Sequence, residues 1–344
     1  MDKRVIFAVA GSGKTTRLVE ELDGGRRCLF FTFTDENVFN LRKKILERYD
    51  KIPANVSVMT YFTFLHSFCF RPAAGLKTKT RGLSFRDPPQ YGQFNQKQDG
   101  YYMDSGRRLY YNRLAKFIML RGLVNEARAR IEQFYDVVCV DEVQDLAGND
   151  FNLLLELMAA KVSILLVGDF RQHTYDTSRD GAVNTNLHSN FKTYTKRFRD
   201  AGVVVDTTSL AASRRCSPAV CDFITRKLNI PISTMSDRAA AVLTVHSQTG
   251  ADNLWMRSDV VKLFYQEHSK YGCHSQNWGA SKGEDHYDEV CVVLNKTTLA
   301  HHQNETLSIL KPATLNKFYV ALSRSRGNVY LVAHKYFDQY KVCL

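Results

Sequence analysis

Short apolar runs alternate with longer amphipathic segments along the chain. The run VIFAV precedes TTRLVEEL, CLFFTF precedes ENVFNLRKKILERY, and VSVM precedes YFTFLHSF. Brief runs rich in β-branched and aromatic residues are typical of buried strands, whereas the longer segments have the period of helices. Because this alternation is typical of parallel sheets covered by helices, the pattern predicts an α/β protein.

The alternation lapses in two places. Between Gly75 and Gly106 the chain is polar and rich in Gly, Pro, Gln and Tyr, which predicts an inserted loop or flap outside the core. A second polar stretch, Asp180 to Arg199, is the best candidate for a domain boundary. Since 344 residues exceed what one core usually fills, we expect two domains. The first spans 1–200, with a short insertion around 75–135, and the second spans 201–344.

Composition narrows the class of protein. Hydrophobic residues make up 44% and charged residues 24% of the chain, as in a soluble globular protein. No apolar run is long enough to cross a bilayer, and the first residues lack the pattern of a secretion signal, so we expect a cytoplasmic protein without a membrane role. The eight cysteines occur singly, which predicts reduced thiols. A net charge of +12 permits a polyanionic partner without requiring one.

A glycine-rich segment follows the first predicted strand and opens a helix. Its glycines let backbone N–H groups converge on phosphate oxygens, Lys14 reaches the β- and γ-phosphates, and Thr15 is placed to ligate Mg²⁺. Ala10 stands where the common pattern has its first glycine. The alternative is a glycine-rich turn with an incidental lysine. The predicted nucleotide-binding residues are Ala10, Gly11, Ser12, Gly13, Lys14, Thr15 and Thr16.

Two carboxylates follow the apolar run VVCV at 137–140. The run is expected to deliver Asp141 and Glu142 at the carboxyl end of a strand. Asp141 would complete a Mg²⁺ site with Thr15, and Glu142 would accept a proton from the attacking water. Taken alone, the pair also fits two solvated carboxylates at a helix start. The phosphate-binding loop upstream favours the nucleotide interpretation.

Eight segments in order resemble the motif set of UvrD/Rep-like superfamily 1 helicases. They are AGSGKTT, FTFTDENVFNLR, TYFTFLHSF, VDEVQDL, LLVGDFRQHTY, LAASRRCSPAVCDFI, ASKGEDHYDEVCVV and FYVALSRSRGNVYL. The resemblance implies two RecA-like P-loop domains of parallel sheets flanked by helices, with the nucleotide in the cleft between them. It also implies a nucleic-acid-stimulated ATPase that acts as a DNA helicase or single-strand translocase, in the 3′ to 5′ direction.

The same resemblance assigns further nucleotide contacts. It gives Gln172 a role in sensing the γ-phosphate, places Arg215 at that phosphate, makes Arg324 the arginine finger, and sets Glu284 beside the nucleotide. Guanidinium groups suit this chemistry because they neutralise charge that develops in phosphoryl transfer. The competing assignments are their neighbours, Arg214 for Arg215 and Arg326 for Arg324.

Aromatic and hydroxyl side chains in the motifs predict a surface for single-stranded nucleic acid. Rings suit stacked bases, and hydroxyls suit phosphates. For any one ring, packing in the core is the commoner role, so that alternative stays open. The predicted residues are Thr32, Phe33, Thr60, Tyr61, Phe64, His66, Tyr175, Ser281 and Lys282.

Two departures from the helicase pattern limit the prediction. Nine residues precede Ala10, so we expect the glutamine segment with which many relatives recognise adenine to be absent, and ATP is assigned over GTP by default. Between Arg215 and Ser281 there is no room for the large inserted domain of UvrD-like relatives, which predicts a compact form. The expected ligands are ATP, Mg²⁺ and single-stranded or tailed duplex nucleic acid, DNA rather than RNA. The alternative function is an ATP-gated sensing subunit that works with a partner such as a nuclease.

Overall fold

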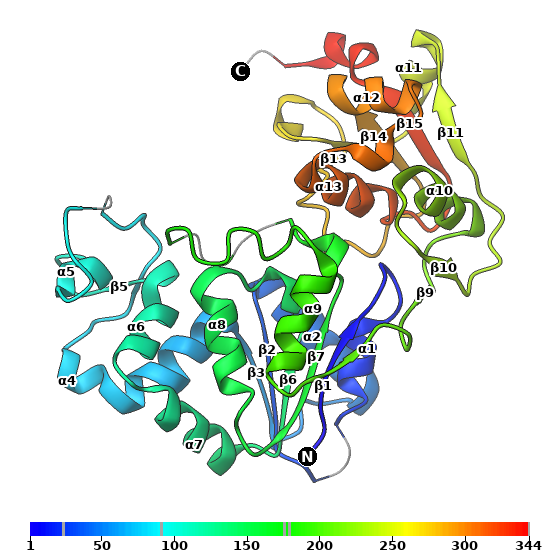
Figure 1. Ribbon diagram of the computed structural model, residues 1–344. Coiled ribbons are helices and arrows are strands. Elements are labelled where there is room, and N and C mark those ends of the chain that lie inside the picture. Colours follow the sequence, from blue (N-terminus) through cyan, green and yellow to red (C-terminus); the bar gives the residue numbers. More distant parts are fainter. Residues whose placement is uncertain (23–24, 90–91, 175–176, 178–179, 343–344) are drawn as a thin grey trace. The chain divides into compact units, whose positions relative to one another are not determined.

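The computed structural model describes residues 1–22, 25–89, 92–174, 177 and 180–342, which form two compact units (Figure 1). Unit 1 comprises Met1–Ile6, Lys14–Gly168 and Tyr175–Asp206, and unit 2 comprises Phe7–Gly13, Asp169–Thr174 and Thr207–Leu344. Two short segments therefore pack with unit 2 although their sequence neighbours belong to unit 1. The last passage between units, after Asp206, lies close to the boundary predicted after residue 200.

Unit 1 is built on a six-stranded sheet with the order β3-β2-β6-β7-β1-β8. The neighbours β3 and β2, β2 and β6, β6 and β7, and β1 and β8 pair in parallel. Its strands are β1 (Lys3–Phe7), β2 (Cys28–Thr32), β3 (Val56–Thr60), β6 (Val137–Val140), β7 (Ser163–Gly168) and β8 (Val204–Asp206). Strands β2 and β6 are buried along their whole length, as expected of apolar runs in the middle of a covered parallel sheet.

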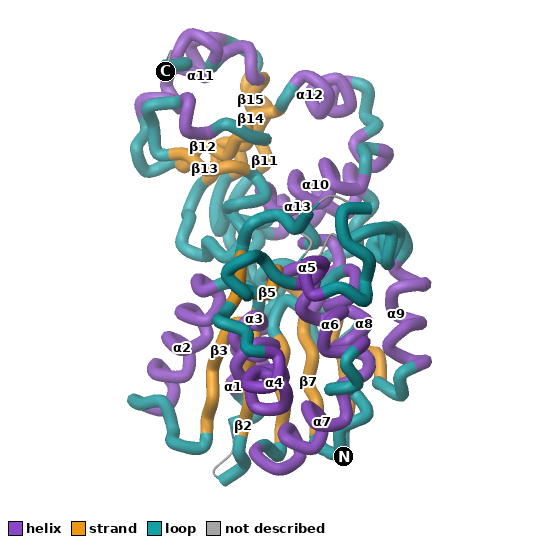
Figure 2. Tube along the Cα trace, turned by 90° about the vertical axis from the view of Figure 1, so that its left-hand side faces the viewer, coloured by secondary structure: helices purple, strands orange, loops and turns teal. Residues whose placement is uncertain are grey.

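Helices cover both faces of this sheet. Helices α1 and α2 lie on one face, and α8 and α9 lie on the other (Figures 1 and 2). Helix α2 begins where Thr34 accepts a hydrogen bond from the Asn37 N–H at 3.1 Å, a typical N-cap. The helices of unit 1 are α1 (Lys14–Val19), α2 (Asp35–Tyr49), α3 (Tyr61–Thr63), the π-helix η1 (Phe64–Gly75), α4 (Leu76–Thr78), α5 (Asp99–Tyr102), α6 (Leu114–Leu120), α7 (Val124–Phe134), α8 (Gly148–Leu157) and α9 (Phe191–Asp200).

The polar segment between Gly75 and Gly106 is not wholly outside the core. It contains β4 (Leu83–Ser84), which pairs in parallel with β5 (Leu109–Tyr110). Tyr101, Tyr102 and Met103 are buried, so the prediction of a loop outside the core is wrong for these residues.

A buried ion pair accounts for the burial of Tyr101. Arg113 Nε lies 2.9 Å from Asp180 Oδ1, and the Tyr101 hydroxyl donates to Asp180 Oδ2 at 3.1 Å. The Arg113 guanidinium lies over the Tyr101 ring, 3.9 Å from its centroid. A buried charged pair is stable only when its remaining hydrogen-bonding groups are satisfied, and the tyrosine hydroxyl does this.

Unit 2 is built on a five-stranded sheet with the order β11-β15-β14-β12-β13, in which all neighbours are parallel. Its strands are β11 (Val242–Val245), β12 (Val261–Phe264), β13 (Ser275–Asn277), β14 (Val290–Leu294) and β15 (Val329–Ala333). Along β14, Val290 and Val292 pack into one apolar cluster, whereas Cys291 and Val293 pack into another. The strand therefore has a core on each face of the sheet.

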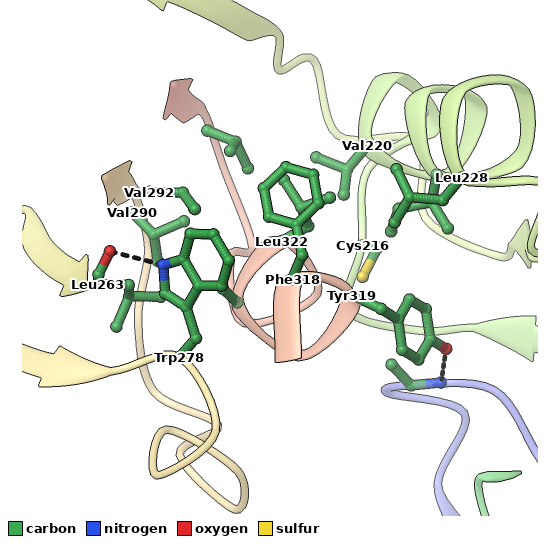
Figure 3. Close-up of a cluster of buried hydrophobic side chains, with 14 of the residues drawn as sticks. Cys216, Val220, Leu228, Leu263, Trp278, Val290, Val292, Phe318, Tyr319 and Leu322 are labelled. Atoms are coloured by element: carbon green, nitrogen blue, oxygen red, sulfur yellow. Dashed lines mark hydrogen bonds between the residues drawn. The ribbon is translucent and has the colours of Figure 1, made fainter. Parts of the chain in front are cut away.

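Helix α13 brings the largest side chains into the first of these clusters (Figure 3). Phe318 and Tyr319 lie there with Trp278, whose indole N–H donates to the Leu263 carbonyl at 2.8 Å. The remaining elements of unit 2 are β9 (Ala212–Ser213), β10 (Ser233–Thr234), α10 (Pro218–Leu228), α11 (Gln248–Met256), α12 (Lys296–Gln303) and α13 (Pro312–Leu322). Two parallel sheets flanked by helices confirm the predicted α/β class.

Single turns of 3₁₀ helix join many of these elements. They are η2 (Tyr111–Arg113), η3 (Val143–Asp145), η4 (Phe170–Gln172), η5 (His268–Lys270), η6 (Leu307–Ile309), η7 (His334–Tyr336) and η8 (Asp338–Tyr340). Within the described ranges, no helix combines the length and apolar character needed to cross a membrane. The cysteines of the described part of the chain, at 28, 69, 139, 216, 221, 273 and 291, are free thiols.

Candidate nucleotide site and nucleic-acid surface

The glycine-rich segment after β1 adopts a conformation that requires glycine. Gly11 has φ +71° and Gly13 has φ +95°, both in the left-handed region. A Cβ atom on Gly11 would also lie 2.7 Å from Arg215 Cβ and 2.8 Å from Ser213 Oγ. The Arg214 N–H donates to the Gly11 carbonyl at 2.9 Å. Within unit 2, Gly11 is thus required both by its backbone angle and by the close approach of the segment that carries Arg215.

The first residues of α1 face the end of β6 within unit 1. Lys14 is buried, and Thr15 Oγ1 donates to Asp141 Oδ2 at 2.9 Å. Burial and the neighbouring Glu142 raise the pKa of Asp141, while Lys14 and the Thr15 hydroxyl act in the opposite direction. A hydroxyl and a desolvated carboxylate at this distance are a donor set that suits Mg²⁺. The two residues predicted as metal ligands are thus brought together.

Glu142 is held by its own backbone and by Gln144. Its φ of +54° lies in the left-handed region, and its N–H donates to Asp141 Oδ1 at 2.9 Å. Gln144 is fully buried, and its side-chain amide donates to Glu142 Oε2 at 2.5 Å. Gln144 lies in the motif VDEVQDL, but the resemblance assigns it no role. The sequence does carry a signal, because a glutamine two residues after the predicted base needs a polar partner if it is buried.

Several buried polar atoms in unit 2 have no hydrogen-bond partner among the described residues. Two of them are Ser12 Oγ and Gln172 Nε2. The backbone of Gln172 is fixed by its N–H, which donates to the Asp169 carbonyl at 2.9 Å. Leaving a buried polar group unpaired costs about 1–3 kcal/mol, so a ligand that accepts and donates hydrogen bonds here would be stabilised. Both atoms belong to residues that were predicted to contact the nucleotide.

The two predicted arginines share one carboxylate in unit 2. Arg215 donates to the Ser323 carbonyl at 3.0 Å and pairs with Asp285. Arg324 is only 2% exposed, and its Nη1 lies 3.6 Å from Asp285 Oδ1. The competing residues, Arg214 and Arg326, are both exposed. The resemblance gives Asp285 no role, because it places the neighbouring Glu284 beside the nucleotide.

That neighbour, Glu284, contacts Arg324 through its backbone. The Arg324 Nη1 group donates to the Glu284 carbonyl oxygen at 3.5 Å, and Nε donates to the Val320 carbonyl at 3.2 Å. The Glu284 carboxylate lies 3.4 Å from His286 Nδ1. The role of Glu284 at the nucleotide stays a prediction.

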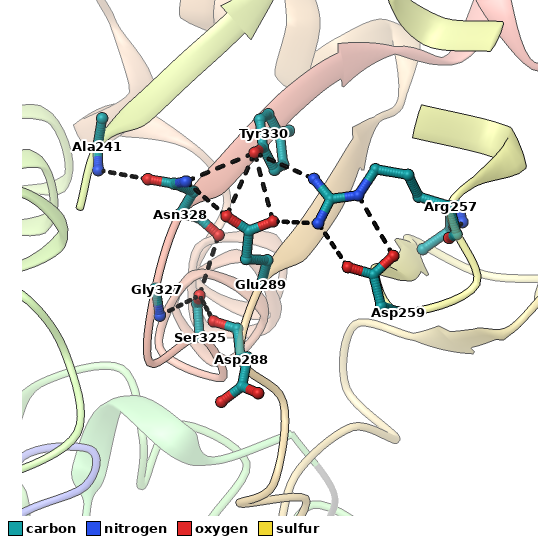
Figure 4. Close-up of polar contacts among 10 residues, drawn as sticks. Ala241, Arg257, Asp259, Asp288, Glu289, Ser325, Gly327, Asn328 and Tyr330 are labelled. Carbon is teal, nitrogen blue, oxygen red and sulfur yellow. Dashed lines mark hydrogen bonds and ion pairs between the residues drawn. The ribbon is translucent and has the colours of Figure 1, made fainter. Parts of the chain in front are cut away.

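A polar network fixes the turn that follows Arg324 (Figure 4). Ser325 Oγ donates to the Asp288 carbonyl at 2.9 Å, and the Asn328 side chain accepts from the Ala241 N–H at 2.9 Å. Glu289 accepts from Arg257 at 2.6 Å and also bonds to Asn328. The turn between α13 and β15 is thereby tied to neighbouring strands, which orients the end of α13 that carries Arg324.

Tyr319 joins the phosphate-binding segment to η4 within unit 2. Its hydroxyl accepts from the Ala10 N–H at 2.9 Å (Figure 3) and donates to Asp169 Oδ2 at 3.0 Å. Burial raises its pKa well above the usual value, with Asp169 as the second cause, so the hydroxyl stays protonated. The sequence gives no reason to expect Tyr319 to contact Ala10 and Asp169, which are distant from it along the chain.

Four of the predicted nucleic-acid residues are buried. The Phe64 ring is stacked on Phe31 with centroids 4.5 Å apart, and the Tyr61 hydroxyl donates to Asp150 at 3.1 Å. Ser281 donates to the Trp278 carbonyl at 2.7 Å. Thr32 is also buried. For Tyr61 and Phe64 the geometry favours the alternative of core packing, because neither ring has a free face for a base.

The other predicted nucleic-acid residues are partly exposed. Phe33 contacts the Phe62 ring, and Thr60 caps α3 by accepting from the Thr63 N–H at 3.2 Å. His66 is half-buried, and burial lowers its pKa. Lys282 is partly exposed as well. Tyr175 lies outside the described residues.

Two family models match the sequence, a AAA domain over residues 2–178 and a viral superfamily 1 RNA helicase core domain over residues 122–333. Among solved structures, the chain is similar to an arterivirus nonstructural protein 10 helicase in complex with DNA. The two are 15% identical with a TM-score of 0.52, over 98% of this chain and 62% of that chain. A second structure of an arterivirus nonstructural protein 10 helicase is 15% identical with a TM-score of 0.51, over 98% of this chain and 61% of that chain.

At this identity the likeness concerns the fold. The chain spans about three fifths of the length of these two helicases. No curated protein matches the sequence.

Proposed function

Because the chain belongs to the family of viral superfamily 1 RNA helicase core domains, we propose that it is an ATP-hydrolysing motor that acts on nucleic acid. The hydrogen bond between Thr15 and Asp141 is the observation that carries this proposal. It joins the start of the helix after the glycine-rich loop to the end of β6, the arrangement needed to bind a nucleotide and its metal ion.

Each residue then has a defined task. Lys14 and the backbone N–H groups of the loop bind the phosphates, and Thr15 and Asp141 hold Mg²⁺, which neutralises phosphate charge when bound. Glu142 accepts a proton from the attacking water, and Gln144 fixes the orientation of the Glu142 carboxylate through their hydrogen bond.

The arginines and Gln172 belong to the γ-phosphate side of the proposal. Arg215 and Arg324 are both tied to Asp285, so the two guanidinium groups are held close to the same anion. A phosphate that binds between them would take over the role of that carboxylate. Gln172 carries the unpaired buried amide that a phosphate oxygen would satisfy.

For the nucleic acid, the UvrD/Rep-like motif order favours DNA and movement in the 3′ to 5′ direction. The description of the matching family model names RNA helicases, and one similar helicase was solved with DNA. We therefore keep DNA and 3′ to 5′ movement as the prediction, with RNA as the competing substrate.

Phosphate release measures the ATPase proposal directly. Hydrolysis of ATP should be accelerated by single-stranded oligonucleotides, and Lys14→Ala should abolish it by removing the ammonium that pairs with the phosphates. Lys43→Ala is the matched control, because Lys43 is an exposed lysine on α2. Parental turnover in a folded Lys14→Ala variant would remove the basis of the proposal.

Strand displacement identifies the substrate. Tailed DNA and RNA duplexes of both polarities should be compared at equal concentration, and the 3′-tailed DNA should be unwound fastest. Hydrolysis stimulated by single strands without displacement of any duplex would favour a translocase or an ATP-gated switch.

A further inference from the structure

Four aromatic side chains follow the ends of paired strands in unit 1. Residue Thr32 of β2 is in register with Thr60 of β3, and Phe33 and Phe62 come just after them. Ser84 of β4 is in register with Tyr110 of β5, and Phe85 and Tyr111 are the next residues. Parallel strands in register end at the same edge, so each pair of rings is brought together. We name Phe33, Phe62, Phe85 and Tyr111 the aromatic strip.

The rings of the aromatic strip form a continuous chain of contacts. Centroids lie 5.7 Å apart between Phe33 and Phe62, 5.4 Å apart between Phe62 and Tyr111, and 5.4 Å apart between Tyr111 and Phe85. The last pair is stacked, with an interplanar angle of 25°. Phe85 is 66% exposed, and the other three rings are partly exposed. A large ring this exposed at the end of an aromatic chain is a surface prepared for another planar group.

The charge beside the aromatic strip indicates what kind of molecule binds there. The segment 77–86, which leads into the aromatic strip, contains no acidic residue. Its four cations are all exposed, and they are Lys77, Lys79, Arg81 and Arg86. Exposed rings beside exposed cations are the two features with which proteins bind single strands, because bases stack and phosphates pair with positive charge. A protein partner would have to present an acidic surface to match these cations.

We propose that the aromatic strip is the stacking platform for bases of a single-stranded nucleic acid, in place of the buried rings of Tyr61 and Phe64. The proposal rests on the proposed function, since it names the contact through which that function reaches its strand. Phe85 supplies the outermost stacking face, and the cations of segment 77–86 bind the adjacent phosphates. Stacking tolerates any base, so the platform fits a motor that must move along every sequence.

Affinity for fluorescent single strands of DNA and RNA tests the platform. Phe85→Ala should weaken binding about 5- to 100-fold, the range expected for loss of one stacked base, and Phe85→Trp should restore it. Phe39→Ala is the matched control, because Phe39 is 65% exposed on α2 and has no ring contact among the described residues. ATP hydrolysis without nucleic acid should be the same in the parent and in Phe39→Ala.

The salt dependence of binding separates stacking from charge. Phe85→Ala should leave the slope of log affinity against log salt unchanged, whereas Arg86→Ala should reduce it by about one. Provided that the parent binds strands, two outcomes would overturn the platform. One is parental affinity in Phe85→Ala, and the other is an equal loss of affinity in Phe85→Ala and Phe39→Ala. If the parent itself binds neither DNA nor RNA, the proposed function fails instead.

Discussion

Gln144 donates a hydrogen bond from its side-chain amide to Glu142 Oε2 over 2.5 Å. Glu142 has a left-handed backbone, so its carboxylate is aimed by a conformation that few residues adopt. The hydrogen bond fixes the remaining freedom of the side chain. Gln144 is therefore a positioning residue for the proposed base.

Replacing either residue should separate binding from turnover. Glu142→Gln should keep ATP affinity and lower kcat by about 10²–10⁴, because the amide cannot accept the proton. Gln144→Met should lower kcat less, by about 10-fold, with little change in KM, since Glu142 is still present but less well oriented. Steady-state kinetics and nucleotide binding check both variants. Parental kcat in Glu142→Gln would show that Glu142 is a solvated carboxylate.

Gly168→Ala, at the end of β7, should lower turnover in the same way as Gln144→Met. A Cβ atom on Gly168 would lie 2.4 Å from Gln144 Oε1 and 2.9 Å from Val143 Cγ1, so the amide must move. We expect lower kcat, together with a loss of stability of about 1–3 kcal/mol from overpacking. Gly272→Ala is a control for stability alone, because Gly272 is exposed, its φ lies outside the left-handed region, and a Cβ there would meet only Val342 Cγ2, at 3.8 Å. An unchanged kcat in Gly168→Ala would argue against the positioning role.

Arg324 and Arg326 provide a direct comparison of two nearby arginines. Arg324 is buried beside Asp285 and Arg326 is exposed, so Arg324→Ala should lower kcat by about 10³–10⁵, the usual cost of losing an arginine finger. Arg324→Lys should not restore it, because an ammonium lacks the planar fork. Arg326→Ala should behave as the parent in the same phosphate-release assay. The opposite pattern would show that Arg326 is the finger.

Phe64→Ala should act on stability rather than on strand binding. The ring is buried and stacked between Phe31 and Phe68, with centroids 4.5 and 5.7 Å away. Truncation should cost about 3–5 kcal/mol of unfolding free energy. Denaturant unfolding measures that loss, and titration below the unfolding transition should give parental affinity. A folded variant with weaker strand binding would restore Phe64 to the nucleic-acid surface.

Asp150 should make stability depend on pH. Burial raises its pKa from 3.8 to about 7, while hydrogen bonds such as that from Tyr61 act in the opposite direction. The folded state binds this proton more tightly than the unfolded state, so stability falls as pH rises from about 4 to 7. Asp150→Asn should remove this fall, worth about 1–3 kcal/mol between pH 5 and 8. The control is Asp87→Asn, because Asp87 is exposed.

If the parent and Asp150→Asn lose stability in parallel over this pH range, another group carries the dependence. Thermal unfolding of the three proteins at each pH gives the comparison.

The nucleotide-site motifs could be read from the sequence because their geometry is local. A strand, a glycine loop and a helix place Lys14 and Thr15, and the end of a second strand places Asp141, so their proximity follows from a parallel sheet. The superfamily 1 assignment is confirmed by the family match, whereas the UvrD/Rep-like subdivision stays a prediction.

Contacts between distant segments could not be read in the same way. Two such contacts depend on how α13 and the loop before β14 pack in unit 2. They join Tyr319 to Ala10 and Asp285 to Arg215. The aromatic residues were ambiguous for a different reason. Tyr61 and Phe62 are adjacent in sequence, and only the direction of α3 decides that the first is buried and the second is partly exposed.

The position of β1 in the sheet has a consequence for folding. This strand ends at Phe7 and lies between β7, which begins at Ser163, and β8, which begins at Val204. Strand β1 is therefore synthesised well before both of its partners, and such distant pairings fold slowly. Until then its apolar edge is open to pairing with other chains. The glycine-rich loop that follows β1 acquires its final place only when this late step is complete, so nucleotide binding during refolding would report closure of the sheet.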